Sequence, residues 1–499
     1  MKIKQILYAF AFSAVASVAV ASMAIAQKAP DAGGMGLNPA TLSEAQIAST
    51  QVPQALYRLA AIYKQGGDYE RLTWTLQRLS ALQPNVGDLK LALATTYALQ
   101  GEKTKTYDLL LAMQKEGYAY DLAKNPNFVK VADTKVWTYI TDNLNAGLKP
   151  FGEGKVAFTL AKGDTLFESL VFDPARQQFL VGSVRDGKIH FVDKNGKLTE
   201  FIAPNAENGL WSVYAMAADP AADALYVAST ASVYFKGFTP ADYGKAGVFK
   251  FKLSTGKLEA KYLLTPDARV TAQTLSSIAV GKNGLVFAAD GLRNIIYHLD
   301  GGALKPMVEN PRLTSLRGMA VSEDGKTLYF ADYALGLFGV DLAAGKGFDL
   351  QYDPAKLALG GIDGLYWYDG TLTVIQNGMS PHRVIRLGLS ADGQRVTRAV
   401  PLDAANPAFG LPTYGAIDGD GLYFVANSQK NQYDSYGSPK DGAKLEPVNV
   451  FRSNLRFAWD KGGIEMRAAL VKAAPLNTFK PGTGVFKNVE GGSQSVTGT

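Results

Sequence analysis

Six polar residues stand at one register of a repeated apolar pattern, and their types suit them to bind a ligand or to act on one. They are Glu168, Tyr214, Ser276, Arg317, Asp363 and Tyr414, separated by 46, 62, 41, 46 and 51 residues. Carboxylates accept hydrogen bonds, a guanidinium donates them, and hydroxyl groups do both. Polar side chains at one place in otherwise apolar strands are hard to explain as core. They predict a ligand-binding ring, with a solvated channel lining that binds nothing as the alternative.

The segment that carries each of these residues has the pattern of an antiparallel β unit. Around Arg317, apolar runs at 319–321 and 328–331 flank Asp324-Gly325, a hairpin signal because Gly supplies the positive φ of the turn. Six copies at this spacing predict four-stranded blades, so 155–457 should form an all-β six-bladed propeller with the six polar residues at its central channel. A β-sandwich is the alternative. We expect 156–160 to complete the last blade and 230–247 to be an insertion.

The preceding segment, 42–147, has helical periodicity. Its stretches 53–84 and 87–118 superpose with a shift of 34 residues, and a third helical segment follows. Two repeats leave an apolar face uncovered, so we expect this array to pack on the propeller, with a groove for a partner peptide as the alternative. Residues 145–155 should be a linker. The predicted fold class is therefore α + β multidomain, a short helical repeat array followed by a propeller.

Two family resemblances add to this interpretation. The helical array resembles the tetratricopeptide repeat, whose small, aromatic, turn-Gly, aromatic and Pro positions are occupied by Ala60, Tyr63, Gly67, Tyr69 and Pro84. The region 155–457 is similar to the SMP-30/gluconolactonase-like six-bladed propellers, and the tract 363–389 (DGLYWYDGTLTVIQNGMSPHRVIRLGL) looks like bacterial members of that superfamily.

The second resemblance implies a metal site. It implies one calcium or zinc ion with Glu168 and Asp363 as metal ligands, and Asp363 as the catalytic base that hydrolyses a lactone or ester. Ser276 and Arg317 stand where that superfamily has Asn ligands. Because an Arg has no lone pair to give and adds a positive charge, we expect Arg317 to replace the metal and donate to both carboxylates, and we expect no cofactor.

Composition indicates the compartment and excludes several classes of function. Residues 1–26 join Lys2 and Lys4 to an apolar run and a small-x-small end, which predicts a signal peptide cleaved near Ala26 and a periplasmic or secreted protein. No Cys is present, which excludes disulfides and thiol nucleophiles. The basic residues are scattered, so no nucleic-acid partner is expected, and no later apolar run is long enough to span a membrane. Residues 27–41 and 477–499 should be a flexible leader and tail.

Two functions follow from these observations. The first is an exported propeller protein that binds a small polar ligand or a protein partner at the channel mouth. The second is a metal-dependent lactonase or esterase, so the two differ in whether the chain is an enzyme. Hydrolysis of that kind needs the metal to polarise the carbonyl group, whereas binding needs only complementary donors and acceptors.

Overall fold

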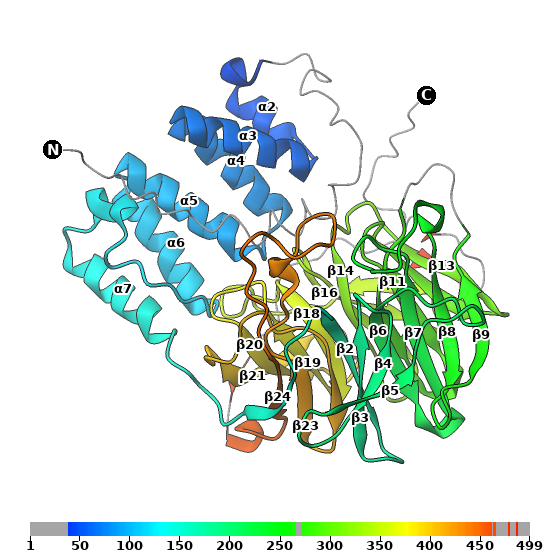
Figure 1. Ribbon diagram of the computed structural model, residues 1–499. Helices are drawn as coiled ribbons and strands as arrows, with labels where there is room; N and C mark the ends of the chain where they lie inside the picture. Colours follow the sequence, from blue (N-terminus) through cyan, green and yellow to red (C-terminus); the bar gives the residue numbers. More distant parts are fainter. Residues whose placement is uncertain (1–37, 266–271, 462, 466–477, 480–485, 488–499) are drawn as a thin grey trace.

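The computed structural model describes residues 38–265, 272–461, 463–465, 478–479 and 486–487 (Figure 1). The predicted signal peptide and residues 27–37 of the predicted leader lie outside this range. Within the leader, Pro39–Thr41 (η2) forms a 3₁₀ turn whose Pro39 carbonyl accepts a hydrogen bond from the Tyr63 hydroxyl at 2.8 Å. The end of the predicted leader is therefore in contact with α3 of the helical array.

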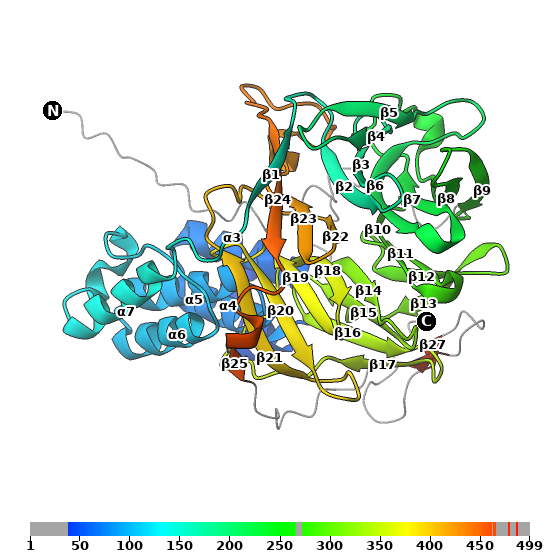
Figure 2. The same cartoon turned by 90° about the horizontal axis from the view of Figure 1, so that it is seen from below.

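The propeller has six antiparallel sheets around a central channel, which confirms the predicted fold class (Figure 2). The first three blades are β2 (Phe167–Asp173), β3 (Gln178–Ser183), β4 (Ile189–Val192) and β5 (Leu198–Ile202); β6 (Ser212–Asp219), β7 (Ala224–Thr230), β8 (Ala246–Lys252) and β9 (Leu258–Leu263); and β10 (Leu275–Val280), β11 (Val286–Asp290), β12 (Ile295–Asp300) and β13 (Ala303–Glu309). Blades four to six are β14 (Leu316–Val321), β15 (Thr327–Asp332), β16 (Gly336–Asp341) and β17 (Lys346–Asp349); β18 (Ile362–Tyr368), β19 (Thr371–Gln376), β20 (Arg383–Leu389) and β21 (Val396–Ala404); and β22 (Gly415–Asp418), β23 (Gly421–Val425), β24 (Val448–Asn454) and β1 (Lys155–Leu160).

Two features explain why the ring of blades closes. The N-terminal strand β1 pairs with β24, so the last blade is completed from the other end of the propeller sequence, as predicted. Each pair of neighbouring blades also shares a core; between the third and fourth blades it includes Phe287, Leu328 and Phe330. Because both faces of the inner strands are buried in this way, strands such as β3 and β11 are continuous apolar runs without alternation.

The helical region contains two equivalent helix pairs and a third unit. The helices are α2 (Glu44–Ser49), α3 (Pro53–Gly66), α4 (Tyr69–Leu82), α5 (Gly87–Gln100), α6 (Lys103–Lys115) and α7 (Lys135–Ala146). The starts of α5 and α6 follow those of α3 and α4 by 34 residues (87 − 53 and 103 − 69), as the sequence predicts. Gly67 and Gly101 end α3 and α5 with positive φ, 69° and 80°, which Gly adopts without strain. The third segment is split: η3 (Pro126–Val131) precedes α7, which Thr134 caps.

The array packs on the fourth and fifth blades, as expected from its uncovered apolar face (Figure 1). Ala334, Ala358 and Met379 of the propeller belong to its two apolar clusters. They lie in connections of β15–β16, β17–β18 and β19–β20, all at the end of the channel where the inner strands begin. The helices therefore stand beside the predicted ring.

Residues beyond the predicted propeller end at 457 add short strands to the outer edges of two blades, the fourth and the fifth. Ile464–Glu465 (β25) pairs with β21, and Thr478–Phe479 (β26) pairs with Lys346 of β17 and with Phe486–Lys487 (β27). Residues 478–479 and 486–487 of the predicted tail therefore form strands, since the outer edge of a blade offers unpaired backbone groups to any strand. The rest of the tail lies outside the described residues. In the described ranges, no helix is both long and apolar enough to cross a membrane.

Candidate functional site at the channel mouth

The six residues of the predicted ring come from six different blades. Glu168, Tyr214, Ser276, Arg317 and Asp363 lie near the starts of β2, β6, β10, β14 and β18, and Tyr414 directly precedes β22. The charges of Glu168, Arg317 and Asp363 act on one another, and the charge of Glu168 acts on both tyrosines. The structure therefore gathers the six positions at one end of the channel, here called the mouth.

Arg317 and Asp363 form the ion pair of the mouth. Arg317 Nε lies 3.5 Å from Asp363 Oδ1, and Arg317 Nη1 donates to the Leu316 carbonyl at 3.2 Å. The guanidinium also lies over the Tyr333 ring, 5.5 Å from its centroid. The second Asp363 oxygen accepts from Asn377 Nδ2 at 3.1 Å. Arg317 is thus held on one side of the mouth.

Glu168 lies on another side and has a different partner. The Ser428 hydroxyl donates to Glu168 Oε1, and among the described residues Arg317 pairs with Asp363 but not with Glu168. The expectation that the guanidinium donates to both carboxylates is wrong for Glu168. Tyr333 and Asp363 draw the guanidinium toward the fourth and fifth blades, so its influence on Glu168 is only electrostatic.

Burial raises the pKa of both carboxyl groups above the ordinary value. For Glu168, the Lys430 charge, the Ser428 hydrogen bond and Arg317 act against the rise in pKa, while Asp363 adds to it. For Asp363, burial again dominates, and Arg317, Lys430 and Asn377 lower the pKa in part. A raised pKa moves a carboxyl group toward its protonated form, which donates one hydrogen bond.

Part of the hydrogen-bonding capacity of the mouth is unused. The Ser276 hydroxyl is buried and has no hydrogen-bond partner among the described residues. A Cβ added to Gly291 would lie 2.5 Å from Ser276 Oγ and 3.4 Å from Arg317 Nη1, so only a glycine lets the backbone pass this close to the two groups. Buried polar groups are normally satisfied, which marks this place as one where a ligand or water completes the bonds.

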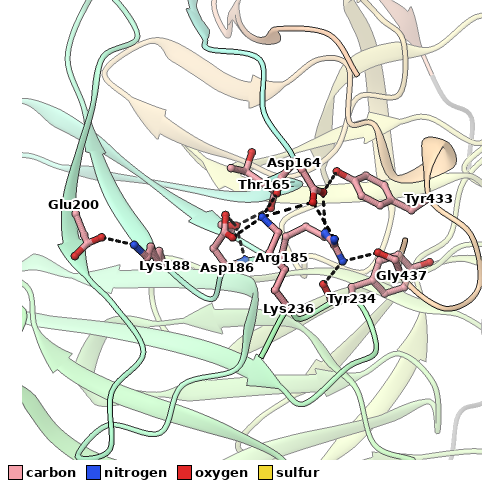
Figure 3. Close-up of polar contacts among 11 residues, drawn as sticks. Asp164, Thr165, Arg185, Asp186, Lys188, Glu200, Tyr234, Lys236, Tyr433 and Gly437 are labelled. Carbon is pink, nitrogen blue, oxygen red and sulfur yellow. Dashed lines mark hydrogen bonds and ion pairs between the residues drawn. The ribbon is translucent and has the colours of Figure 1, made fainter. Parts of the chain in front are cut away.

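Two loops cover the Glu168 side of the mouth. These mouth loops are 231–245, between β7 and β8, and 426–447, between β23 and β24. Arg185 joins them by donating from Nη1 to the carbonyls of Tyr234 and Gly437, while its Nε and Nη2 donate to Asp164 at 2.8 and 2.9 Å (Figure 3). The Tyr433 hydroxyl donates to Asp164 Oδ1 at 2.9 Å. We call this group the Arg185 latch.

The insertion that the sequence predicts at 230–247 contains the first mouth loop, which contributes Tyr234 to the covering of the mouth. Tyr234 lies edge-on to Tyr433 with ring centroids 6.3 Å apart, and both pack in a cluster with Tyr214 of the ring. Lys236 adds hydrogen bonds to the Asp164 carbonyl at 2.6 Å and to Asp186 at 2.8 Å. The insertion thus packs against the mouth through its tyrosines.

The helical array supports the opposite side of the mouth. Asn85, in the turn between α4 and α5, donates from its backbone N–H to Ala334 O (3.3 Å) and from Nδ2 to Leu335 O (2.7 Å). The neighbouring residue Tyr333 donates from its hydroxyl to Asn377 Oδ1 at 2.9 Å. Asn377 bonds Asp363, so a continuous set of contacts runs from the array to the ring.

Sequence reasoning missed the residues that surround the ring. Asn377 and Ser428 follow the second strands of their blades, and Tyr333 follows β15. In an antiparallel blade the second strand ends where the first begins, so polar residues after second strands reach the mouth. That signal is visible in the repeats. Arg185 follows β3, the second strand of its blade, and carries the same signal, whereas Lys430 lies farther along its loop and has none.

The residues present do not fit the divalent metal that the resemblance implies. The described residues contain no group of three or more His, Cys, Asp or Glu that could hold a metal ion. Beside Asp363 stands a guanidinium, and the amide oxygen of Asn377 already accepts from Tyr333. Calcium prefers six to eight oxygen ligands, and zinc about four nitrogen, sulfur or oxygen ligands. Two carboxyl groups and an adjacent cation fall short of either set.

Comparisons with known proteins give only distant likenesses. No family model matches the chain, and no curated protein does. Among solved structures it is similar to a gluconolactonase from Xanthomonas campestris, with 14% identity over 62% of this chain and 92% of that one and a TM-score of 0.39. It is also similar to the PQQ-bound aldose sugar dehydrogenase from Streptomyces coelicolor, with 17% identity over 61% and 99% and a TM-score of 0.39. A virginiamycin B lyase from Staphylococcus aureus has 12% identity over 61% and 100% and a TM-score of 0.37. Likenesses this weak carry no argument about activity. What the chain's own strands establish is a six-bladed propeller preceded by a helical repeat array.

Proposed function

We propose that this chain is a binding protein that takes a small, uncharged polyhydroxylated molecule, such as a sugar, at the channel mouth. The observation that carries the proposal is the unused hydrogen-bonding capacity beside Ser276 and Arg317. Hydroxyl groups both donate and accept, so a polyol complements a carboxyl group, a guanidinium and a hydroxyl at once. Tyr214 and Tyr414 add aromatic surface for the apolar face of a sugar ring.

The charges of the mouth support an uncharged ligand. When ionised, Glu168 and Asp363 are balanced by Arg317 and Lys430, both of which act on the two carboxyl groups. A ligand with a net charge would meet a group of the same sign within this balanced set, at a cost in desolvation. A neutral polyol avoids that cost.

The alternative function is a metal-dependent lactonase or esterase with Asp363 as base. The pairing of Asp363 with Arg317 argues against it, because a guanidinium beside the base repels a divalent cation. The two functions are separated by titrating purified full-length protein with D-glucose and with glucono-1,5-lactone. Saturable binding without turnover supports a binding protein. Lactone hydrolysis that requires calcium or zinc would establish the alternative.

Three variants test which residues hold the ligand. Arg317→Gln and Glu168→Gln should each weaken sugar binding at least tenfold, since each removes a charged hydrogen-bonding partner. Lys326→Gln, at an exposed turn of the fourth blade, is the matched control and should bind as the wild type does. Unchanged affinity in both ring variants would refute the proposed site.

We also propose that the protein acts outside the cytoplasm, on the basis of the pattern in residues 1–26. Mass spectrometry of the mature chain after expression in a bacterium should give an N-terminus near Gln27. A chain that retains Met1 would contradict this. A protein partner for the helical array remains a second proposal, to be tested by cross-linking in the periplasm.

A further inference from the structure

A cavity with both apolar and polar lining lies in the channel below the polar ring. Two positions after each ring residue stands an apolar one: Leu170, Met216, Ile278, Met319, Leu365 and Ala416. All six line a cavity of about 510 Å³ that begins at Tyr366 and Tyr414. It reaches the exposed turn residues Pro174, Pro220 and Gly419, on the face opposite the helical array. The cavity therefore has its own entrance, away from the mouth loops.

Small residues between the two rings let the inner strands approach closely. The intervening positions are Ser169, Ala215, Ser277, Gly318, Gly364 and Gly415. A Cβ on Gly318 would lie 2.6 Å from Leu365 N and 2.8 Å from Asp363 O, closer than real Cβ atoms come. The channel is thus built as a polar tier, a tier of small residues and an apolar tier.

The lining determines what the cavity could hold. Leu170, Met319 and Leu365 are nearly fully buried, and flexible thioether side chains adapt to apolar ligands of different shapes. The volume falls within the range of about 300–1,000 Å³ that is typical of small-molecule sites.

Charged groups are scarce in the cavity, although hydroxyl groups line it. Among the described lining residues Asp418, next to the outer turn, is the only charged one, and the Ser169 and Ser277 side chains also belong to the lining. The buried Ser169 hydroxyl has no hydrogen-bond partner among the described residues. At the inner end, the Tyr366 hydroxyl accepts from the Gly415 N–H at 2.6 Å, which leaves its own proton to donate. A ligand with an ionic group would lose hydration there without gaining a partner of opposite charge among the lining residues.

We propose that this cavity is a second binding site, for a small uncharged amphiphile. The apolar body of the ligand packs against the tier of Leu, Ile and Met side chains, and a single hydroxyl or carbonyl group reaches Tyr366 and Tyr414. The site lies below the sugar site proposed at the mouth and shares Tyr414 with it, while its apolar tier is its own.

Calorimetric titration of the full-length protein with 1-octanol tests this proposal. We expect saturable binding of one equivalent with a negative heat-capacity change, the mark of apolar burial. Ala416→Leu fills part of the cavity and should weaken octanol binding at least tenfold. The matched control, Ala343→Leu at an exposed turn, should not change it. Absence of saturable binding, or equal affinity in Ala416→Leu, would overturn the proposal.

Two further measurements keep the test decisive if Ala416→Leu folds poorly. Met319→Ala enlarges the cavity and should shift the preference from 1-octanol to 1-decanol; an unchanged preference counts against the site. Arg317→Gln should leave octanol binding intact while it weakens sugar binding. Loss of octanol binding in that variant would show that there is one site rather than two.

Discussion

The two sides of the channel mouth are held in different ways. On the side of the fourth and fifth blades, Asn85 of the helical array bonds neutral backbone carbonyls, and the nearby Ser380 hydroxyl donates to Ala119 O at 2.7 Å. On the side of Glu168, the mouth loops are held by the Arg185 latch, in which Asp164 is one-third exposed. Neutral hydrogen bonds to the helical array, here called the support, therefore hold one side of the ring. Loops joined by ion pairs, here called the cover, hold the other side.

The physical consequence is a difference in response to conditions. Neutral hydrogen bonds between buried groups do not titrate and are little affected by salt, whereas partly exposed ion pairs are screened. The buried cation Arg383 does not change this, because its bonds run to the neutral acceptors Gln376 Oε1, Ala358 O and Gly117 O. We therefore expect the cover, and not the support, to open with acid and salt.

The largest expected effect comes from removing the latch. Arg185→Ala removes the guanidinium from Asp164, which keeps the Tyr433 hydroxyl, and leaves two carbonyl groups without their Arg185 donor. It should destabilise the protein by about 3 kcal/mol, the lower end for a broken buried pair, because Asp164 is partly solvated. Limited proteolysis should then cut within 426–447. Arg185→Lys keeps the charge but cannot donate to both Asp164 oxygens, so its stability should lie between those of the wild type and Arg185→Ala. A variant as stable and resistant as the wild type would refute the latch.

The latch should also weaken at low pH. Partial burial raises the pKa of Asp164. The hydrogen bonds from Arg185 and Tyr433 lower this pKa by more, so it lies below its ordinary value. A lowered folded-state pKa gives stability that is complete above the unfolded value of 3.8 and is lost as pH falls through the folded value. Proteolysis of the mouth loops by pepsin should rise below about pH 4 in the wild type. The same rise in Arg185→Ala would argue against Asp164 as the cause.

A smaller effect is expected at the support. Asn85→Ala leaves Leu335 O and the Tyr352 hydroxyl without their partner and should cost about 2 kcal/mol, with no dependence on salt. It should also weaken sugar binding several-fold, because Tyr333 and Asn377 position Asp363. Asn143→Ala, exposed on α7, is the control and should stay within about 0.5 kcal/mol of the wild type. If the loss of stability in Asn85→Ala and in Arg185→Ala depended equally on salt, the proposed difference between the two sides of the mouth would be wrong.

The smallest expected effect concerns the predicted linker at 145–155, which is joined to β21 of the fifth blade. Phe151 forms a β-bridge with Ala404, and Gly154 N–H donates to Asp403 at 2.8 Å. Burial raises the pKa of Asp403 from 3.8 to about 6, so its ionisation disfavours the folded state as pH rises through about 6. Asp403→Asn should therefore add about 1–2 kcal/mol at pH 7, less than the full linkage because the hydrogen bonds are altered. Stability profiles that stay parallel between pH 4 and 7 would contradict this.

The sequence predicts the blades and the ring because both depend on local patterns. Asp324-Gly325 and its counterparts define the hairpins, and the register of apolar runs places Arg317 and Asp363 at the strand starts. The surroundings of the ring depend on pairs far apart in the chain. Glu168 meets Ser428, and Asn85 meets Leu335, through tertiary packing that no local pattern encodes. The closure by β1 was predictable only because propellers require it.

The central proposal is that Arg317 serves as a fixed cation at the place where the sequence resemblance implies a metal ion. Calorimetry of metal-free protein with calcium and with zinc, for the wild type and Arg317→Asn, tests it most directly. The account predicts no tight binding of either ion by the wild type, and measurable binding by Arg317→Asn once the guanidinium is replaced by an amide oxygen. Tight binding of one equivalent by the wild type, abolished by Glu168→Gln and by Asp363→Asn, would contradict the account.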